Sequence, residues 1–312
     1  MLHRSGSGIV HELGCDKHGI LKTLAYFDIF HYPLTAAEIM QFMDRTVDQE
    51  ALLQRLSQLR VEKKIFQYHG FYSLQNNPLL AHRRRQGNQT AEKLLVKALK
   101  IGRFLYQFPF VRAIGVSGSL SKNYADEKAD IDFFIITKAN RVWIARTLMH
   151  LYKKFTFLTG KQHFHCMNYY IDEKAFLLEE QTIFTAIELK TLLPVSGQQT
   201  MELFFETNKW ANAWLPSCPY RRQERKDPGS SWLKKIGEWL LNGRPGNYAE
   251  NYLLGLTQQR WKRKEEKGKR NKKGQPMGLI TGKHFARSNP GAFREKVLAL
   301  YEQKLEGLTN PQ

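Results

Sequence analysis

Hydrophobic and polar positions follow a helical period through the first part of the chain. Apolar residues recur at three- and four-residue spacing over 21–30, 33–43 and 48–65, which predicts three helices. Thr35, with Glu38 three residues later, has the capping-box pattern of a helix start. Two short strands are predicted around His69 and Gly70. One face of the third helix is rich in leucine, namely Leu52, Leu53, Leu56 and Leu59.

Three helices followed by a small hairpin resemble a winged-helix module. We place this module at residues 16–80, after a flexible N-terminus over 1–15. The third helix would be the recognition helix if the module bound DNA. Winged helices also serve as protein–protein adaptors, and this helix carries mixed charges, including Arg55, Glu62 and Lys63. DNA and protein are therefore both candidate partners.

Helical and strand patterns alternate in the next part of the chain, residues 90–197. A basic connector over 82–90 precedes it, and Pro194 and Gly197 are expected to end its last helix. The order of elements is typical of an α/β or α+β fold. Helices are predicted over 90–108, 141–158 and 173–193, and strands over 111–119, 131–137 and 163–172, the first of them ending in a turn.

The last part of the chain, residues 198–312, is predicted to be a basic helical region. From Pro216 to Gly274 there are 16 Lys and Arg against 6 Asp and Glu, a local net charge of +10. Helices are predicted over 201–215, 232–241, 248–264 and 293–308, with a basic, glycine-containing loop over 267–278.

The composition fits a folded, strongly basic protein. Of 312 residues, 42% are hydrophobic and 12% aromatic, which allows a sizeable core and argues against general disorder. Lys and Arg number 48 against 29 Asp and Glu, for a net charge of +19. This excess favours polyanionic partners, such as nucleic acid, nucleotide phosphates or an anionic membrane surface. A solvated basic surface is the alternative.

The cysteines and the hydropathy pattern bear on the compartment. Cys15, Cys166 and Cys218 are far apart and odd in number, which disfavours a disulfide framework and favours a reducing compartment. The first residues lack the apolar core of a secretory signal, and no stretch approaches the roughly 20 apolar residues of a membrane span. We therefore expect a cytoplasmic protein, attached to a membrane at most peripherally.

The segment 118–132 combines a turn with a charged strand start. A strand that ends in Gly118 and Ser119 lets its backbone approach a ligand closely, because glycine has no Cβ atom. If Ser119 opens a short helix, its backbone N–H groups would face an anion. Further donors to a phosphate would be the hydroxyls of Ser117, Ser119 and Ser121 and the ammonium of Lys122.

Asp130 and Asp132 lie two positions apart at the start of an apolar strand, so both carboxylates point to one face and Ile131 to the other. Two carboxylates on one face repel each other unless a cation lies between them. Mg²⁺ prefers oxygen ligands and is usually held by one or two carboxylates together with substrate phosphates. The turn would then bind a triphosphate and the aspartates its metal. The alternative is a plain turn and a strand that starts at a solvent-exposed edge.

This pattern, Gly-Ser, a ten-residue gap and Asp-x-Asp in an apolar strand, resembles the signature of the nucleotidyltransferase superfamily with the DNA polymerase β-like fold. The resemblance covers residues 90–197 and implies an α+β fold with a mixed sheet and flanking helices. It implies that Gly118 and Ser119 contact nucleotide phosphates. It also implies that Asp130 and Asp132 bind Mg²⁺, with Mn²⁺ as the alternative. The implied activity is transfer of a nucleoside monophosphate from an NTP such as ATP to an acceptor, with release of pyrophosphate.

The superfamily usually has a third carboxylate on a later strand, as metal ligand or general base. In the matching strand, 163–172, strict alternation puts Asn168 and Asp172 on one face, about 13 Å apart. Asp172 would complete a catalytic triad with Asp130 and Asp132. Asn168 would supply a carbonyl ligand to the metal but could not accept a proton. The sequence leaves open which of the two lies at the site.

Two functions therefore compete. The first is a nucleotidyltransferase whose acceptor is a small molecule, a protein or a nucleic acid. The second is a catalytically degenerate, nucleotide-sensing regulator that binds nucleic acid or a protein partner through the winged helix and the basic C-terminal region. Asn168 favours the regulator, whereas the paired Asp130 and Asp132 favour the enzyme.

A weaker alternative concerns the segment 231–244. It has a basic face and an apolar face with two tryptophans, as helices at a membrane interface do. A surface helix packed on the protein is the more common role of such a pattern.

Overall fold

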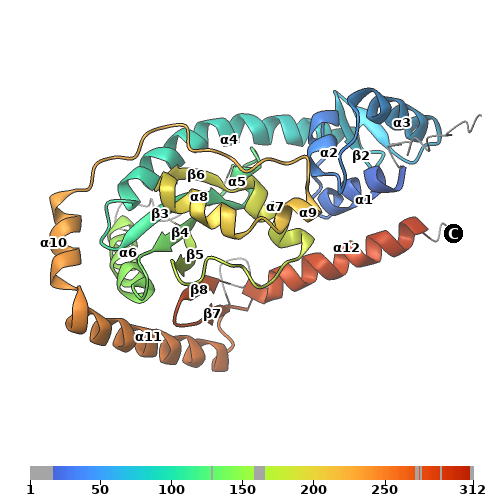
Figure 1. Ribbon diagram of the computed structural model, residues 1–312. Helices are drawn as coiled ribbons and strands as arrows, with labels where there is room; N and C mark the ends of the chain where they lie inside the picture. Colours follow the sequence, from blue (N-terminus) through green and yellow to red (C-terminus); the bar gives the residue numbers. More distant parts are fainter. Residues whose placement is uncertain are drawn as a thin grey trace, which may run out of the picture.

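A mixed sheet flanked by helices forms the body of the protein, and a small helical module lies at one end of it (Figure 1). The computed structural model describes residues 17–309 except 128, 158–165, 271–273, 275 and 289. The predicted α+β class, with a mixed sheet and flanking helices, is confirmed.

The N-terminal module contains the helices and the hairpin that the sequence predicts. Its elements are α1 (Lys17–Asp28), α2 (Ala36–Phe42), α3 (Gln49–Val61), β1 (Phe66–Tyr68) and β2 (Phe71–Ser73). The capping box is present, because the Thr35 hydroxyl accepts from the Glu38 N–H and the Glu38 carboxylate accepts from the Thr35 N–H. The leucine face of α3 is narrower than predicted: Leu53 is exposed, while Leu52, Leu56 and Leu59 are buried.

A single long helix, α4 (Pro78–Leu105), joins this module to the sheet (Figure 1). The basic segment 82–90, predicted as a connector, lies inside this helix. Arg84 is buried there and donates to the Pro33 carbonyl at 2.8 Å and to the Glu38 carboxylate at 2.6 Å. Its guanidinium also lies 3.8 Å from the centre of the Tyr32 ring. Arg84 is therefore part of the packed contact between α4 and the N-terminal module.

The central sheet has six strands in the order β6–β3–β4–β5–β8–β7. They are β3 (Val111–Ser117), β4 (Asp132–Thr137), β5 (Cys166–Asp172), β6 (Leu193–Ser196), β7 (Leu279–Thr281) and β8 (Phe285–Ser288). The β4–β5 pair is parallel, and all other neighbouring pairs are antiparallel. β4, which begins at the predicted Asp132, is therefore one of the two inner strands that lie side by side in parallel.

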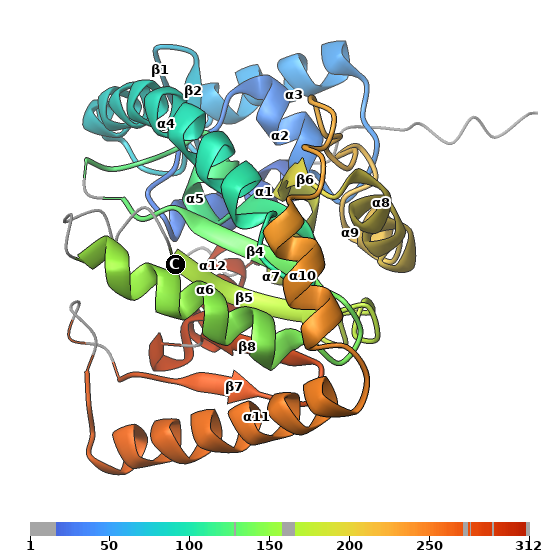
Figure 2. The same ribbon diagram turned by 90° about the vertical axis from the view of Figure 1, so that its left-hand side faces the viewer.

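Helices cover both faces of this sheet (Figure 2). α4 and α6 (Val142–Phe157), with α11 (Gly243–Glu266) outside α6, share a core with Phe133 and Ile135 of β4. On the other face, Phe134 and Ile136 share a core with α7 (Ile183–Thr191), α8 (Gln198–Thr207) and α9 (Ala211–Trp214). Residues of β4 thus alternate between two buried faces, as a strand period of two requires.

Two further predictions about elements are wrong. The pattern over 173–193 predicts one helix, but α7 begins at Ile183, after Thr182 caps it, and Pro194 lies in strand β6. Proline is tolerated there because β6 is an edge strand, which has one row of N–H groups without a strand partner. The C-terminal region is not wholly helical either, since it adds β7 and β8 to the sheet.

Four further helical elements lie within the described residues. They are α5 (Gly118–Ser121), α10 (Trp232–Leu240), the 3₁₀ turn η2 (Pro290–Ala292) and α12 (Phe293–Thr309). α10 lies at the edge of the molecule, and α12 packs against α1 and α7 (Figure 1). Within the residues described above, no helix has both the length and the apolar character needed to cross a bilayer.

Candidate functional site

The turn between β3 and β4 brings Gly118 against Asp132. Ser117 lies opposite Asp132 in the antiparallel pairing, and its hydroxyl donates to the Asp132 carbonyl at 3.4 Å. Gly118 has φ +71°, in the left-handed region that favours glycine. A Cβ atom at position 118 would lie 2.8 Å from Oδ2 of Asp132. Both the backbone conformation and the contact with the carboxylate therefore require glycine at this position.

Asp130 and Asp132 flank Ile131, which is fully buried in the core on the α4–α6 face. β4 begins at Asp132, but the strand pairing extends one residue further, since the Cys166 N–H donates to the Ile131 carbonyl at 3.1 Å. Alternation then places both aspartates on the opposite face. Asp130 is exposed and Asp132 is half-buried. Two carboxylates thus share one face beside the Gly118 turn.

The serines of the turn differ in what they can reach. Ser119 is exposed at the start of α5. Ser121 is fully buried, and its hydroxyl donates to the Gly118 carbonyl at 2.9 Å. This position argues against the predicted contact of Ser121 with a phosphate, because the hydroxyl has no access to solvent and closes the turn from inside.

Lys122 also holds the turn. Its ammonium donates to the Gly118 carbonyl at 3.0 Å and lies 2.7 Å from Oε1 of Glu188 on α7. The side chain is only 14% exposed. The sequence predicts a phosphate ligand at this position, but the lysine is already paired with a carboxylate. Lys122 is therefore placed to fix the geometry of the turn.

Two residues that contact the turn could not be predicted from the sequence. Tyr32, between α1 and α2, donates its hydroxyl to the Lys122 carbonyl at 2.5 Å, and burial raises the pKa of this phenol well above its ordinary value. Glu188 pairs with the Lys122 ammonium from α7. These two partners lie 90 and 66 positions from Lys122, so no local pattern marks them. The turn is thus braced by the N-terminal module on one side and by α7 on the other.

Asp172 lies at the other end of the sheet from the aspartate pair. Asp132, the first residue of β4, pairs with Cys166, whereas Asp172 pairs with Thr137, the last residue of β4. Five residue steps along a strand correspond to about 17 Å. Asp172 therefore cannot share a metal ion with Asp130 and Asp132, and its predicted catalytic role is corrected.

The surroundings of Asp172 indicate a structural role instead. Its side chain is fully buried and accepts hydrogen bonds from the N–H groups of Asn140 at 2.7 Å and Lys174 at 2.9 Å. One of its oxygens also lies 2.9 Å from Nδ1 of His284. The carboxylate thus joins the loop before α6, the end of β5 and the start of β8.

A β-bulge in β5 explains why strict alternation gives the wrong faces. Phe133 pairs with Met167 and Phe134 with Tyr169, so Asn168 is the extra residue between them. Cys166 lies opposite Asp132, while Tyr170, beyond the bulge, faces the α6 core. The side chain of Asn168 lies outside what the structure describes, and its role as a metal ligand stays a prediction.

The residues at the turn fit a divalent cation held together with phosphates. Asp130 and Asp132 supply two carboxylates on one face, the donor type that Mg²⁺ and Mn²⁺ prefer. The missing Cβ of Gly118 brings backbone close to Asp132. In the part of the chain that the structure describes, no group of three or more His, Cys, Asp or Glu is placed to hold a metal.

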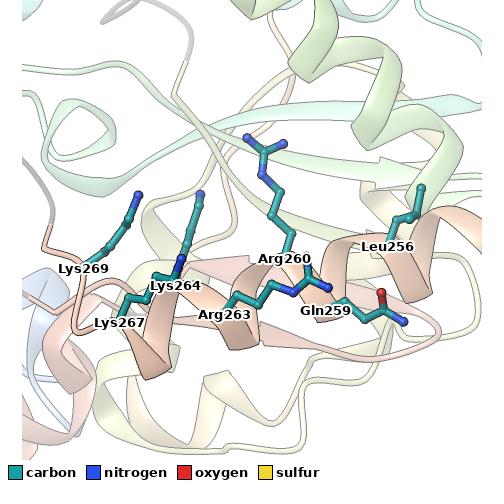
Figure 3. Close-up of a pocket in the computed structure, with 7 residues that line it drawn as sticks. All are labelled: Leu256, Gln259, Arg260, Arg263, Lys264, Lys267 and Lys269. Atoms are coloured by element: carbon teal, nitrogen blue, oxygen red, sulfur yellow. The ribbon is translucent and has the colours of Figure 1, made fainter.

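A second candidate site is a basic cleft at the end of α11, with a volume of about 530 Å³. Figure 3 shows that Arg260, Lys264 and Lys269 extend to the same side of the helix. Burial and the neighbouring cations lower the pKa of Lys264. None of the residues that line the cleft belongs to β3, α5 or β4. The full lining is Leu256, Gln259, Arg260, Arg263, Lys264, Lys267 and Lys269.

Positive charge continues from this cleft toward α6. Burial, with Arg146 as the next cause, lowers the pKa of His150 to about 3, so its imidazole is neutral at physiological pH. Arg260 and Lys264 contribute to the same shift, which places them near His150. Nε2 of His150 is buried, and no residue that the structure describes forms a hydrogen bond with it. A concentration of cations of this kind favours an anionic ligand such as a phosphate group.

No protein-family model, curated protein or solved structure matches this chain. The function is therefore inferred from the geometry of the β3–β4 turn and from the charges around it.

Proposed function

We propose that the protein is a Mg²⁺-dependent nucleotidyltransferase, which transfers a nucleoside monophosphate from an NTP to an acceptor. The observation that carries this proposal is the contact of Gly118 with Asp132. Gly118 has a left-handed backbone conformation, and a Cβ atom placed on it would lie 2.8 Å from Oδ2 of Asp132, the second carboxylate of the Asp-x-Asp pair. The antiparallel β3–β4 pair followed by the parallel β4–β5 pair supports the resemblance to the polymerase β-like sheet.

In this proposal each residue of the turn has a separate task. Gly118 and Ser119 bind the nucleotide phosphates through backbone N–H groups, because the first N–H groups of a helix have no partner within it. Asp130 and Asp132 hold Mg²⁺, or Mn²⁺, which when bound neutralises charge on the phosphate oxygens. Lys122, held by Glu188, keeps the turn in place.

The transfer itself is a substitution at the α-phosphorus. The acceptor oxygen forms a bond to this phosphorus, the bond from the phosphorus to the bridging oxygen breaks, and pyrophosphate leaves with the bonding electrons. The proton of the acceptor hydroxyl passes to water. Positioning and charge neutralisation by the turn and the aspartate pair supply most of the catalysis in such a reaction.

The acceptor is a small molecule, a protein or a nucleic acid, and two features bear on the choice. The basic cleft on α11 favours an anionic acceptor. The N-terminal module has the order of elements of a winged helix, which would contact DNA or protein. A cytoplasmic location stays a prediction from the cysteines.

A nucleotide-sensing regulator is the second candidate, and the position of Asp172 favours it. With Asp172 at the far end of β4, the carboxylates placed at the turn on one strand face are Asp130 and Asp132. A site of this kind would bind an NTP with its metal and would lack a base for the acceptor. The winged-helix-like module and the basic C-terminal region would then carry the signal to nucleic acid or protein.

Measurement of NTP binding and pyrophosphate release tests both candidates. Each NTP is titrated with Mg²⁺ into the wild type and into Asp130→Asn/Asp132→Asn, and pyrophosphate is followed with cell extract as the source of acceptor. We expect the double variant to lose metal-dependent binding and at least about 10²-fold in turnover. Glu224→Gln, which removes one exposed loop carboxylate, is the matched control and should retain both.

The outcomes separate the two functions. Pyrophosphate release that the double variant loses supports the enzyme. Metal-dependent binding without release supports the regulator. Absence of metal-dependent binding of any NTP contradicts both and leaves Gly118 and Asp132 as parts of a structural turn.

A further inference from the structure

α10 is attached to the protein by its polar side and presents its apolar side outward. At 100° per residue, its exposed apolar side chains lie within an arc of about 120°. A surface helix of a globular protein normally turns such a stripe toward the core, and α10 does the opposite. We call these side chains the α10 apolar face: Trp232 (68% exposed), Leu233 (61%), Ile236 (45%), Trp239 (77%) and Leu240 (57%).

A buried lysine and a half-buried ion pair fix this orientation. Lys234 is only 4% exposed and donates to the carbonyls of Tyr106 at 2.8 Å and Val111 at 2.7 Å. Glu238 binds the guanidinium of Arg112 with both oxygens, at 2.8 and 3.1 Å. Turning the helix over would leave the buried Lys234 ammonium without its carbonyl partners, which is strongly unfavourable. The outward position of the apolar face therefore follows from specific contacts on the inward side.

The inward side of α10 also packs closely against the protein at Gly237. A Cβ atom at Gly237 would lie 2.6 Å from Cγ of Pro109, so the backbone of α10 rests directly on the loop between α4 and β3. At its first turn, the Ser231 N–H donates to the side chain of Gln107 at 2.8 Å. α10 is thus seated along its length, and its apolar face is a fixed feature of the surface.

We propose that the α10 apolar face docks on the surface of an anionic lipid bilayer. Tryptophan favours the boundary between headgroups and acyl chains, because its ring is apolar and its N–H is polar. α10 has nine residues, about 14 Å of helix, which is too short to span a bilayer and suits a helix that lies in the interface. This proposal is independent of the nucleotidyltransferase activity.

The charges around the α10 apolar face favour an anionic bilayer over a second copy of the chain as its partner. Lys235 of α10 and Arg244 at the start of α11 are exposed, while the one acidic residue of α10, Glu238, is paired with Arg112. Each cation near an anionic surface improves partition by about fivefold. A second copy of the chain would instead bring two regions of net charge +10, residues 216–274, against each other. An acidic bilayer complements the apolar face and the charge together.

The start of α11 extends the same kind of surface. Tyr248 is 77% exposed and Tyr252 58% exposed, and their rings stack with centroids 6.5 Å apart. α11 follows α10 after only two residues, and both helices lie at the periphery of the molecule (Figure 1, Figure 2). Tyrosine, like tryptophan, has an apolar ring and a polar tip that suit the interface. Both helices therefore expose aromatic side chains and cations on neighbouring parts of the surface.

Vesicle flotation with the full chain tests the proposal. The wild type is mixed with phosphatidylcholine vesicles that contain or lack phosphatidylserine, and we expect flotation with the anionic vesicles. Trp232→Ala/Trp239→Ala should reduce the bound fraction at least about tenfold, since two large apolar side chains no longer leave water. Trp214→Ala is the matched control, because Trp214 is exposed on α9, and it should float as the wild type does.

A fluorescence measurement shows whether the α10 tryptophans enter the bilayer. Brominated lipid in the anionic vesicles should quench the wild-type emission, and Trp232→Phe/Trp239→Phe should remove most of this quenching. Circular dichroism checks that the variants are folded, which is expected for exposed side chains.

No flotation on anionic vesicles overturns the proposal, as does equal flotation of wild type and the double alanine variant. A dimer in light scattering that the double alanine variant loses, without vesicle binding, also overturns it and assigns the face to a second copy.

Discussion

The Cβ position of Gly118 lies 2.8 Å from Oδ2 of Asp132, so the turn after β3 and the first residue of β4 are in direct contact. Ser117 and Asp132 are also register partners in the sheet. Because glycine has no side chain, the Asp132 carboxylate can lie directly against the backbone of the turn. This contact connects the local sequence pattern to the proposed nucleotide site, and it can be tested by a single methyl group.

Gly118→Ala should abolish metal-dependent NTP binding. Alanine at φ +71° is strained by about 1–2 kcal/mol, and its methyl would also meet the Asp132 carboxylate. Gly70→Ala is the matched control, since Gly70 has φ +83° but nothing within 4 Å of its Cβ position. Isothermal titration should show loss of binding in Gly118→Ala alone, while urea unfolding shows a similar strain cost in both. Equal NTP affinity of the two variants would contradict the proposed site.

Asp172→Asn should lower stability and leave NTP binding unchanged. The buried carboxylate accepts from two backbone N–H groups and contacts His284, so loss of its charge should cost about 2–4 kcal/mol in the free energy of unfolding. The nucleotide affinity, measured below the shifted unfolding transition, should stay within about twofold of the wild type, because Asp172 lies at the far end of β4. A large loss of affinity in a folded Asp172→Asn protein would restore Asp172 to the site.

Tyr32→Phe should loosen the turn from the side of the N-terminal module. It removes the hydroxyl that donates to the Lys122 carbonyl, which should cost about 1 kcal/mol of stability and raise the Kd for NTP a few-fold. Tyr68→Phe removes a comparable hydroxyl, which donates to Asn76 in an exposed hydrogen bond far from the turn, and serves as the control. If both variants bind NTP equally well, the module does not brace the site.

Features set by neighbouring residues could be predicted from the sequence. The Thr35 capping box, the hairpin around His69 and Gly70 and the α+β class are confirmed. Each depends on residues a few positions apart, or on a periodicity that a short window displays. The burial of Ile131 between the two aspartates is of the same local kind, since strand alternation directs it into the core.

Features set by distant contacts could not be predicted in this way. One extra residue in β5 is enough to reverse the faces beyond Met167, and no pattern in the sequence marks this bulge. Pro194 suggests a helix end, yet it is tolerated in β6 only because β6 lies at the edge of the sheet. Glu188 reaches the turn from α7, which the sequence places 66 positions away. The outward apolar face of α10 likewise depends on where its buried Lys234 finds carbonyl partners.

Lys234 should give the protein a pH-dependent stability that its exposed neighbour Lys235 does not. Burial, followed by the nearby Arg112, lowers the pKa of Lys234 to about 8 from 10.5. Between these values the unfolded chain binds one more proton than the folded protein, so the free energy of unfolding rises with pH from about 8 toward 10.5. The rise attributable to this group is at most about 3 kcal/mol, and below pH 8 its contribution is constant.

Urea unfolding across this pH range, for the wild type, Lys234→Met and Lys235→Met, measures the effect. Lys234→Met should lose the rise and, through the freed carbonyls of Tyr106 and Val111, be less stable at every pH. Lys235→Met should keep the wild-type slope, because its side chain is exposed. Parallel pH profiles for all three proteins would mean that Lys234 keeps an ordinary pKa in the folded state. The ammonium would then owe its position to its two carbonyl partners alone, without a measurable cost of burial.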